Sequence, residues 1–223
     1  MKYKRMRFKM FSKDEISRNN LKLDILVLLL LIAIAILIYL PYFSLPFIQD
    51  DYQILNCIRI DGSKYIVNYF LDIGNHHYRP IPQLLFYLFY QCISIPLYFH
   101  IFGLMLLILD SFFLYKIFIH ILDNKRVSCY VSILFLSSYY LISNVMKWMV
   151  GIYDLLSFGL AAFGFLLILK GRYRWGNLLF LLAFLCKESV VFSILIPIIY
   201  FFIFYREKIS DYLRKSFWII SLY

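Results

Sequence analysis

The amino-acid sequence predicts an all-α fold, a polytopic bundle of transmembrane helices with about six full spans and the start of a seventh. Two observations support this fold class. Hydrophobic residues make up 63% of the 223 residues, against roughly 45–50% in ordinary soluble domains. They also occur in long runs, and a run of about 20 apolar residues is what a helix needs to cross a bilayer. Because lipid offers the backbone no hydrogen-bond partners, we expect these runs to be helices.

The expected spans follow one another along the chain as five apolar runs. Residues 1–22 carry eight Lys and Arg side chains and are expected to form a basic cytoplasmic N-terminus. The first run is expected to be an uncleaved anchor, because no small-x-small cleavage site follows it. The last run is too long for one helix and is interrupted by the charged segment CKES, so we divide it into two helices joined by a tight turn. The runs are residues 23–42, 101–121, 127–145, 152–169 and 175–204.

The formal net charge of +10 comes mainly from Lys and Arg residues at alternate ends of the expected spans. Such residues collect on the cytoplasmic side of membrane proteins, so the pattern predicts an integral, multi-pass protein with a cytoplasmic N-terminus. The charge favours contact with anionic lipid head groups, and we expect no nucleic-acid partner. The outer segments are then residues 46–100, 146–151 and 186–189. Only the first is long, and we expect short amphipathic helices within it.

Charged side chains gather in or near these outer segments, at depths where an unpaired charge is costly. Asp50 and Asp51 follow the first span; they either cap a short helix or belong to a functional site. Arg79, in the segment HHYRPIPQ, lies at a proline-stiffened corner. It either extends to the phosphates of surrounding lipids or is held rigidly toward a bound phosphate. The candidate site residues are Asp50, Asp51, Arg79, Lys147, Asp154, Lys187 and Glu188.

Signals for a metal or a cofactor are weak in this sequence. The four cysteines show no metal-ligand spacing, and the adjacent His76 and His77 are poorly placed to aim at one ion. We therefore expect no metal site and no cofactor, with a divalent metal left open. Asp110, near the middle of the second span, is interpreted as a buried acid that is bonded to a neighbouring helix.

Several segments, taken in order, resemble the membrane glycosyltransferases of the GT-C fold, and most closely the protein O-mannosyltransferase-like branch with its TMTC-type proteins. The similarity covers about residues 40–205, within an expected GT-C-like domain at residues 23–205. An acidic pair opens the first outer loop of that family, an Arg-Pro element closes it, and a Lys-Glu or Lys-Gly turn separates two later helices. The segments are QDDYQI, YRPIPQLLFYLFY, LYFHIFGLML, VMKWMVGIYDLLSFGLAAFGFLLIL and LLFLLAFLCKESVVFSILIPII.

The resemblance implies transfer of a sugar from a polyprenyl-phosphate carrier to a glycan, lipid or protein acceptor at the extracytoplasmic membrane face of the cell envelope. By position in the motifs, Asp50 would be the general base of an inverting displacement, and Asp51 would orient it or bind the acceptor. Arg79, Lys147 and Lys187 would bind the lipid phosphate. Asp154 and Glu188 are further candidates for binding the substrate.

The sequence also allows other functions, and it departs from the family pattern at some positions. The main alternative is a non-catalytic membrane subunit or a flippase-like protein of envelope glycan assembly; another is an envelope-polymer enzyme of a different kind. The family often has His or Asn in the second span, where this chain has Leu104 and Asp110. Residues 206–223 are expected to be a cytoplasmic loop and the start of a truncated seventh span, which suggests a fragment of a longer enzyme.

Overall fold

The computed structural model describes residues 16–71, 78–92, 95–138 and 147–220. All regular secondary structure in these ranges is helical, which confirms the all-α prediction for the described part of the chain. The α-helices are α1 (Ile16–Tyr39), α2 (Asp50–Asp61), α3 (Ser63–Leu71), α4 (Pro80–Cys92), α5 (Pro96–Leu122), α6 (Lys125–Leu136), α7 (Ile152–Leu169), α8 (Tyr173–Cys186), α9 (Leu195–Phe204) and α10 (Arg206–Ile220). Three 3-10 segments join them: η1 (Leu40–Ser44), η3 (Met149–Gly151) and η4 (Glu188–Ile194).

Three helical segments of the described chain are long and apolar enough to cross a membrane: Leu21–Ser44, Pro96–Leu122 and Met149–Leu169. They coincide with the first, second and fourth predicted spans, and they indicate a membrane protein. The apolar segments Tyr173–Cys186 and Glu188–Phe204 are shorter than a full span. The third predicted span begins as α6 and continues into residues outside the described ranges.

The predicted division of the last apolar run into two helices is confirmed. Helix α8 ends at Cys186, and η4 begins at Glu188. Lys187 lies between them in an extended conformation, with φ −158° and ψ 125°. Two charged residues at this break favour an end to the helix near water, because carrying them through an apolar helix would require their desolvation.

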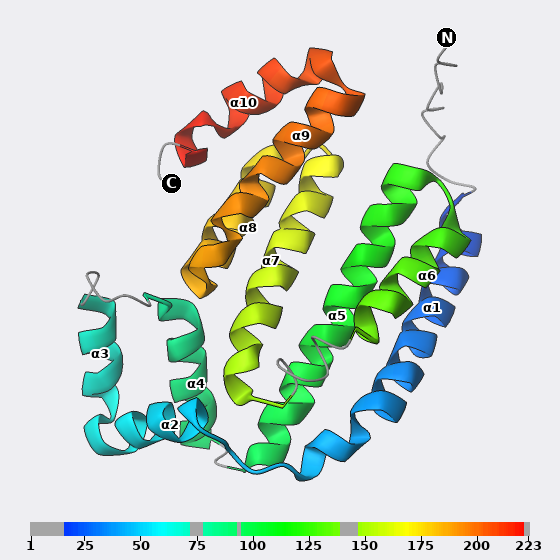
Figure 1. Ribbon diagram of the computed structural model, residues 1–223. Coiled ribbons are helices and arrows are strands. Elements are labelled where there is room, and N and C mark those ends of the chain that lie inside the picture. The colour runs from blue at the N-terminus through cyan, green and yellow to red at the C-terminus, as the bar shows by residue number, and fades with distance from the viewer. Residues whose placement is uncertain (1–15, 72–77, 93–94, 139–146, 221–223) are drawn as a thin grey trace.

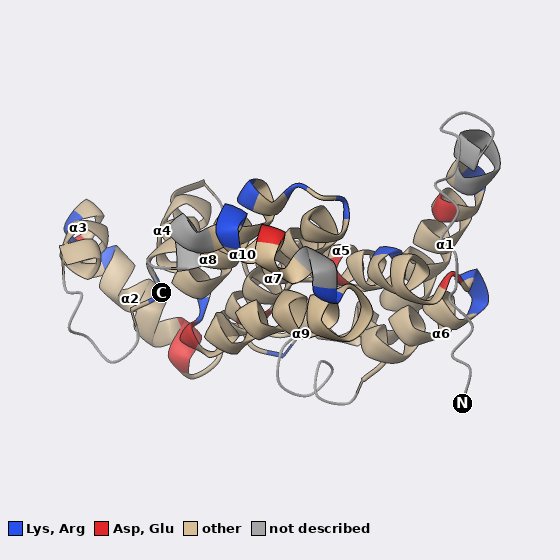
Figure 2. Cartoon of the chain, turned by 90° about the horizontal axis from the view of Figure 1, so that it is seen from above, with Lys and Arg blue, Asp and Glu red and all other residues tan. Residues whose placement is uncertain are grey.

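The long helices lie roughly side by side, with shorter helices at both ends of the bundle (Figure 1). Helices α2, α3 and α4 lie beside one end, which we call the loop end, together with the starts of α5 and α7. Helix α10 crosses the opposite end, which we call the α10 end, above α8 and α9. Seen from the α10 end, Lys and Arg residues lie along α10 and at the start of α6 (Figure 2).

Helices α7 and α8 approach each other closely because glycines face each other across their contact. A Cβ atom on Gly164 would lie 2.7 Å from the backbone oxygen of Gly176, and one on Gly176 would lie 2.5 Å from Cγ1 of Ile168. Small residues allow such approach in membrane helices, where dispersion contacts hold neighbouring helices together. This pair sets the spacing that places the end of α8 beside the start of α7.

Among the described residues, the buried side chains form three groups, and the third positions the candidate site. The first joins α1, α5, α6 and the start of α7, and the second joins α5 with α7 to α10. The third lies at the loop end, between α2, α4 and the first turns of α5 and α7. Its buried members are Leu55, Ile58, Phe86, Phe99, Met149, Ile152 and Tyr153.

Asp110 is buried as predicted, with an exposed fraction of 1%. Its Oδ1 lies against the backbone of Gly159 in α7, where a side chain would have no room. The predicted bond to a neighbouring helix is not found for Oδ2, which has no hydrogen-bond partner among the described residues. Glycine at this place lets the two helices close around the acid.

Candidate functional site

The start of helix α2 is tied to the start of α7 by the buried side chain of Asp51. Its Oδ2 accepts hydrogen bonds from the backbone N–H groups of Ile48, at 3.1 Å, and Met149, at 3.2 Å. Its Oδ1 accepts a third from Val150, also at 3.1 Å. The side chain reaches three residues back to Ile48, as in a helix cap, and also joins segments 98 residues apart.

Burial has the largest effect on the charge of Asp51, and it raises the pKa of this carboxyl group. The three N–H donors and the nearby His100 act in the opposite direction and stabilise the charged form. The carboxylate is held by its donors and is 2% exposed, so it is poorly placed to take a proton from a substrate. The structure therefore favours a structural or orienting role for Asp51.

Asp50 has a different environment from its neighbour, because its side chain is exposed on the first turn of α2. The residue before it, Gln49, has φ 42°, a conformation that non-glycine residues rarely adopt. The bonds of Asp51 to the two segments hold this turn in place. Of the two adjacent acids, Asp50 is thus the one that can meet a substrate.

The corner before α4 brings Arg79 to the η4 segment. Helix α4 begins at Pro80, as the proline pattern predicts, so Arg79 lies directly before its first turn. Its Nε donates to Glu188 Oε2 at 2.9 Å and its Nη2 to Oε1 at 2.6 Å. This two-pronged contact uses the planar fork of the guanidinium, and it raises the pKa of Arg79 further above its usual range.

The other charged pair of the site joins α7 to the break between α8 and η4. Lys187 donates to Oδ1 of Asp154, in the first turn of α7, and both side chains are partly exposed. Successive side chains of an extended segment point to opposite sides. Lys187 and Glu188 can therefore contact α7 and the start of α4 at the same time, although they are adjacent in sequence.

Tyr153 is a buried side chain that lies next to both Arg79 and helix α4. It is 2% exposed and packs against Phe86 of α4, with ring centroids 5.3 Å apart. The guanidinium carbon of Arg79 lies 5.8 Å from the centre of the Tyr153 ring. The sequence pattern does not point to this tyrosine, although it stands directly before the candidate residue Asp154.

Two more polar contacts that the sequence did not predict support the Arg79 corner. The backbone N–H of Arg79 donates to the hydroxyl of Tyr69 in α3, at 3.2 Å. The hydroxyl of Tyr65, one helical turn earlier, donates to Oε1 of the buried Gln83 at 3.0 Å. Tyrosines four residues apart in α3 lie on one face of that helix, and this spacing was the available signal.

The predicted site residues thus divide into those that meet and those that do not. Arg79, Asp154, Lys187 and Glu188 form one charged group at the loop end. Asp51 adjoins this group through η3 and Tyr153. Lys147 is exposed just before η3, and among the described residues no hydrogen bond or ion pair joins it to the other six.

An open cavity of about 220 Å³ lies beside α2 at the same end of the bundle. Aromatic rings and polar groups both line it, and Arg59 donates to Asn56 Oδ1 at 3.0 Å within the lining. Rings with a few amide and guanidinium donors can hold a hydroxylated ring such as a sugar. The lining residues are Phe47, Tyr52, Leu55, Asn56, Arg59 and Tyr90.

In the described part of the chain, no group of three or more His, Cys, Asp or Glu residues is arranged to hold a metal ion. His76 and His77 lie outside the described residues. No protein-family model matches the chain, and neither a curated protein nor a solved structure matches it at a significant level. The resemblance to GT-C glycosyltransferases stays a prediction from the motifs.

Proposed function

We propose that this chain is a glycosyltransferase of the GT-C type, or a part of one, which transfers a sugar from a polyprenyl-phosphate carrier to an acceptor at the extracytoplasmic membrane face. One observation carries the proposal. Two cations and two carboxylates from α7, the start of α4 and the α8–η4 break meet at the loop end, the end of the bundle at which α2 begins with the exposed Asp50. A lipid-linked substrate has its reactive carbon at the membrane edge, where these groups would lie.

The proposal includes a topology. The N-terminus is cytoplasmic, about six apolar segments cross the membrane, and the loop end with α2, α3 and α4 faces outward. The direction of the helices supports it, since the basic turn between α7 and α8 and the amphipathic α10 lie together at the opposite end (Figure 1). The shorter apolar segments then cross the membrane next to longer neighbours, with the bilayer thinned locally.

In the proposed reaction the acceptor hydroxyl attacks the anomeric carbon of the carrier-linked sugar. The new bond joins the acceptor oxygen to that carbon, and the bond from the carbon to the phosphate oxygen breaks with its electron pair. The proton of the hydroxyl passes to Asp50 as general base. The leaving group is the polyprenyl phosphate, and its growing charge is stabilised by Arg79 and Lys187. A single displacement of this kind inverts the sugar carbon.

The ion pairs indicate how a phosphate would enter. Arg79 is 17% exposed and presents its fork to Glu188, which is 47% exposed. A phosphate group matches the same fork with two oxygens, so Glu188 occupies the place that the donor would take. Because the carboxylate is the more exposed partner, its displacement needs little rearrangement of the surrounding helices.

The alternative of a non-catalytic membrane subunit or a flippase-like protein has an observation of its own. Both cations of the charged group have a carboxylate partner, and Asp51 is engaged by three backbone groups. Such pairing also serves to hold α2, α4, α7 and η4 together without any chemistry. In that case the acids would matter for folding and assembly, and no transfer step would depend on Asp50.

The test uses proteoliposomes that hold the full chain, a polyprenyl-phosphate-linked hexose or hexosamine, and a hydroxyl-bearing glycan, lipid or peptide as acceptor. Release of polyprenyl phosphate is measured by mass spectrometry. We expect Asp50→Asn to slow release by about 10²–10⁴-fold, because amides cannot act as general bases at neutral pH. Asp61→Asn is the matched control, an exposed acid at the far end of α2, and should retain the parent rate. If the parent releases no carrier, or both variants act alike, the subunit alternative takes the place of the proposal.

A further inference from the structure

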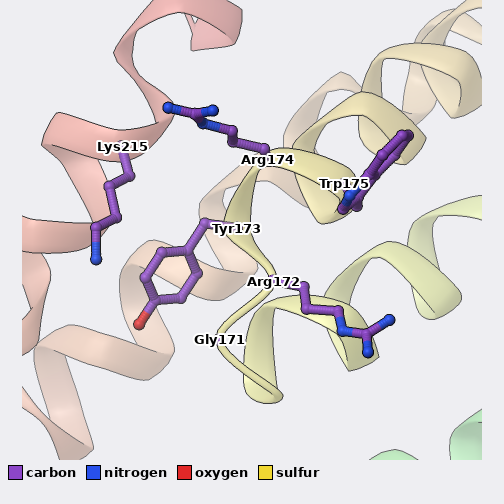
Figure 3. Close-up of a pocket in the computed structure, with 6 residues that line it drawn as sticks. All are labelled: Gly171, Arg172, Tyr173, Arg174, Trp175 and Lys215. Carbon is purple, nitrogen blue, oxygen red and sulfur yellow. The ribbon is translucent and has the colours of Figure 1, made fainter.

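A basic cavity lies at the α10 end of the bundle, far from the charged group of the loop end (Figure 1). It is open, has a volume of about 440 Å³, and lies between the turn that joins α7 to α8 and the helix α10 (Figure 3). Neither the proposed reaction nor the loop end uses it. Its lining residues are Gly171, Arg172, Tyr173, Arg174, Trp175 and Lys215.

The chain forms this cavity through a tight turn. Gly171 has φ 77°, which a glycine adopts without strain, and the backbone N–H of Arg172 donates to the carbonyl of Leu167 at 2.9 Å. Helix α8 then begins at Tyr173, and the residue before it contributes no side-chain cap. The positive end of the α8 dipole and its first N–H groups therefore face the turn.

Three cationic side chains line the cavity, one each from the turn, from α8 and from α10. Arg172 and Arg174 are exposed and extend to different sides of the turn, while Lys215 comes from α10 (Figure 3). The ammonium of Lys215 lies 5.5 Å from the centre of the Tyr173 ring. It also pairs with Asp211 at 2.7 Å, so one carboxylate next to the cavity offsets part of the charge. Positive charge remains in excess at the cavity. Asp211 offsets the charge of Lys215, and Arg172 and Arg174 each add one more positive charge.

Helix α10 is held against the bundle by buried polar contacts, so the cavity has a fixed wall. Asn177 of α8 donates to the hydroxyl of Ser216 at 2.6 Å, and the hydroxyl of Tyr212 donates to Oδ1 of Asn177 at 3.0 Å. All three side chains are fully buried. Because a buried polar group without a partner is costly, this network fixes the position of α10 along α8.

The surroundings of the cavity match a membrane surface. Trp175 is 65% exposed at the start of α8, and Phe202 and Phe204 at the end of α9 are also exposed. Arg206 lies over the ring of Phe202, with its guanidinium carbon 4.9 Å from the ring centre. Tryptophan and arginine next to apolar helices are typical of the level at which lipid head groups lie.

We propose that this cavity binds the phosphate of an anionic membrane lipid, with Arg172, Arg174 and the start of α8 around the head group and Trp175 at the level of the glycerol. Guanidinium forks and helix N-termini both recognise phosphate oxygens. The lipid chains would lie along the exposed apolar face of α9, which presents Ile199, Phe202 and Ile203. A free phosphate would use the same donors but would gain nothing from this face, so the source is the membrane.

The experiment is native mass spectrometry of the full chain, released from lipid nanodiscs that contain phosphatidylcholine and increasing phosphatidylglycerol. We expect one phosphatidylglycerol to remain bound in preference to phosphatidylcholine. Arg172→Ala and Arg174→Ala should each weaken its retention about tenfold, and Arg174→Lys should recover only part of the loss. The matched control is Arg126→Ala, which removes an exposed arginine at the start of α6 at the same end of the bundle and should change retention by less than about threefold.

Each other outcome overturns the proposal. If Arg126→Ala and the cavity variants lose phosphatidylglycerol retention equally, the attraction is a diffuse one between a basic surface and an anionic membrane. Equal retention of phosphatidylcholine would exclude recognition of net charge. Displacement of the lipid by millimolar inorganic phosphate would mean that the cavity takes free phosphate. Circular dichroism of each variant separates loss of lipid from loss of folding, and none of these outcomes depends on sugar transfer at the loop end.

Discussion

Replacing Asp51 by alanine should destabilise the protein far more than the same change at its neighbour Asp50. Asp51→Ala leaves the N–H groups of Ile48, Met149 and Val150 without their carboxylate acceptor. A buried donor without a partner costs about 1–3 kcal/mol. The bond from Met149 is buried and the other two are partly buried, so water can replace some of the loss. We expect a total of about 2–5 kcal/mol.

The assay for this prediction is thermal unfolding of the purified chain in detergent, with tryptophan fluorescence as the signal. Asp50→Ala is the control, because an exposed residue of this kind changes stability by about 0.5 kcal/mol or less. The transition midpoint should fall by several degrees for Asp51→Ala and stay near the parent value for Asp50→Ala. Equal midpoints for the two variants would refute the role of Asp51 as the tie between α2 and α7.

The pH dependence of stability in the parent and in Asp51→Asn gives a second check. Burial raises the pKa of Asp51 in the folded state above its ordinary value of 3.8. The folded state therefore holds the proton more tightly, and this contribution to stability is complete below pH 3.8 and lost as the pH rises through the folded pKa. Against Asp51→Asn, which does not titrate, the parent should become relatively less stable with rising pH. If the difference in stability between the parent and Asp51→Asn stays constant with pH, the raised pKa of Asp51 is contradicted.

Three further predictions concern packing, donor binding and topology. Gly176→Ala should lower stability by about 1–3 kcal/mol, because the new methyl group would lie 2.7 Å from the backbone oxygen of Gly164 in α7 and 2.5 Å from Cγ1 of Ile168. Glu188→Ala should tighten binding of polyprenyl phosphate by releasing the fork of Arg79, whereas Arg79→Ala should weaken it by roughly 10- to 150-fold. A cysteine at Ser63 should be labelled from outside the cell, and one at Asn124 should not.

Controls make these three predictions decisive. Leu37→Ala, at a position that is 79% exposed, should leave the midpoint unchanged, and a loss equal to that of Gly176→Ala would exclude a packing effect. If Glu188→Ala and Arg79→Ala both bind polyprenyl phosphate with the parent affinity, the proposed phosphate site at Arg79 is wrong. Labelling is done in a chain without its four cysteines, and modification of the Asn124 position from outside would reverse the proposed topology.

The sequence by itself determined that the described chain is helical and where some of its helices begin or end. Runs of apolar residues can only be helical in lipid, and this requirement is local. The runs 101–121 and 152–169 could therefore be predicted as helices, and they lie within Pro96–Leu122 and Met149–Leu169. The break at Lys187 and the helix start at Pro80 were also predictable, because charge and proline act on the backbone of their own segment. The sequence likewise singled out the four charged residues that pair at the loop end.

Only the tertiary structure decided which of these residues act together. Asp51 bonds to η3, and Arg79 pairs with Glu188, so each of these contacts joins segments that are distant in sequence. The burial of Tyr153 depends on a neighbouring helix. The contact between α7 and α8 fixes these distances through two glycines, whose only signal is the absence of a side chain. Helical periodicity gives the faces of a helix, but the partner of each face follows from the packing of the whole bundle.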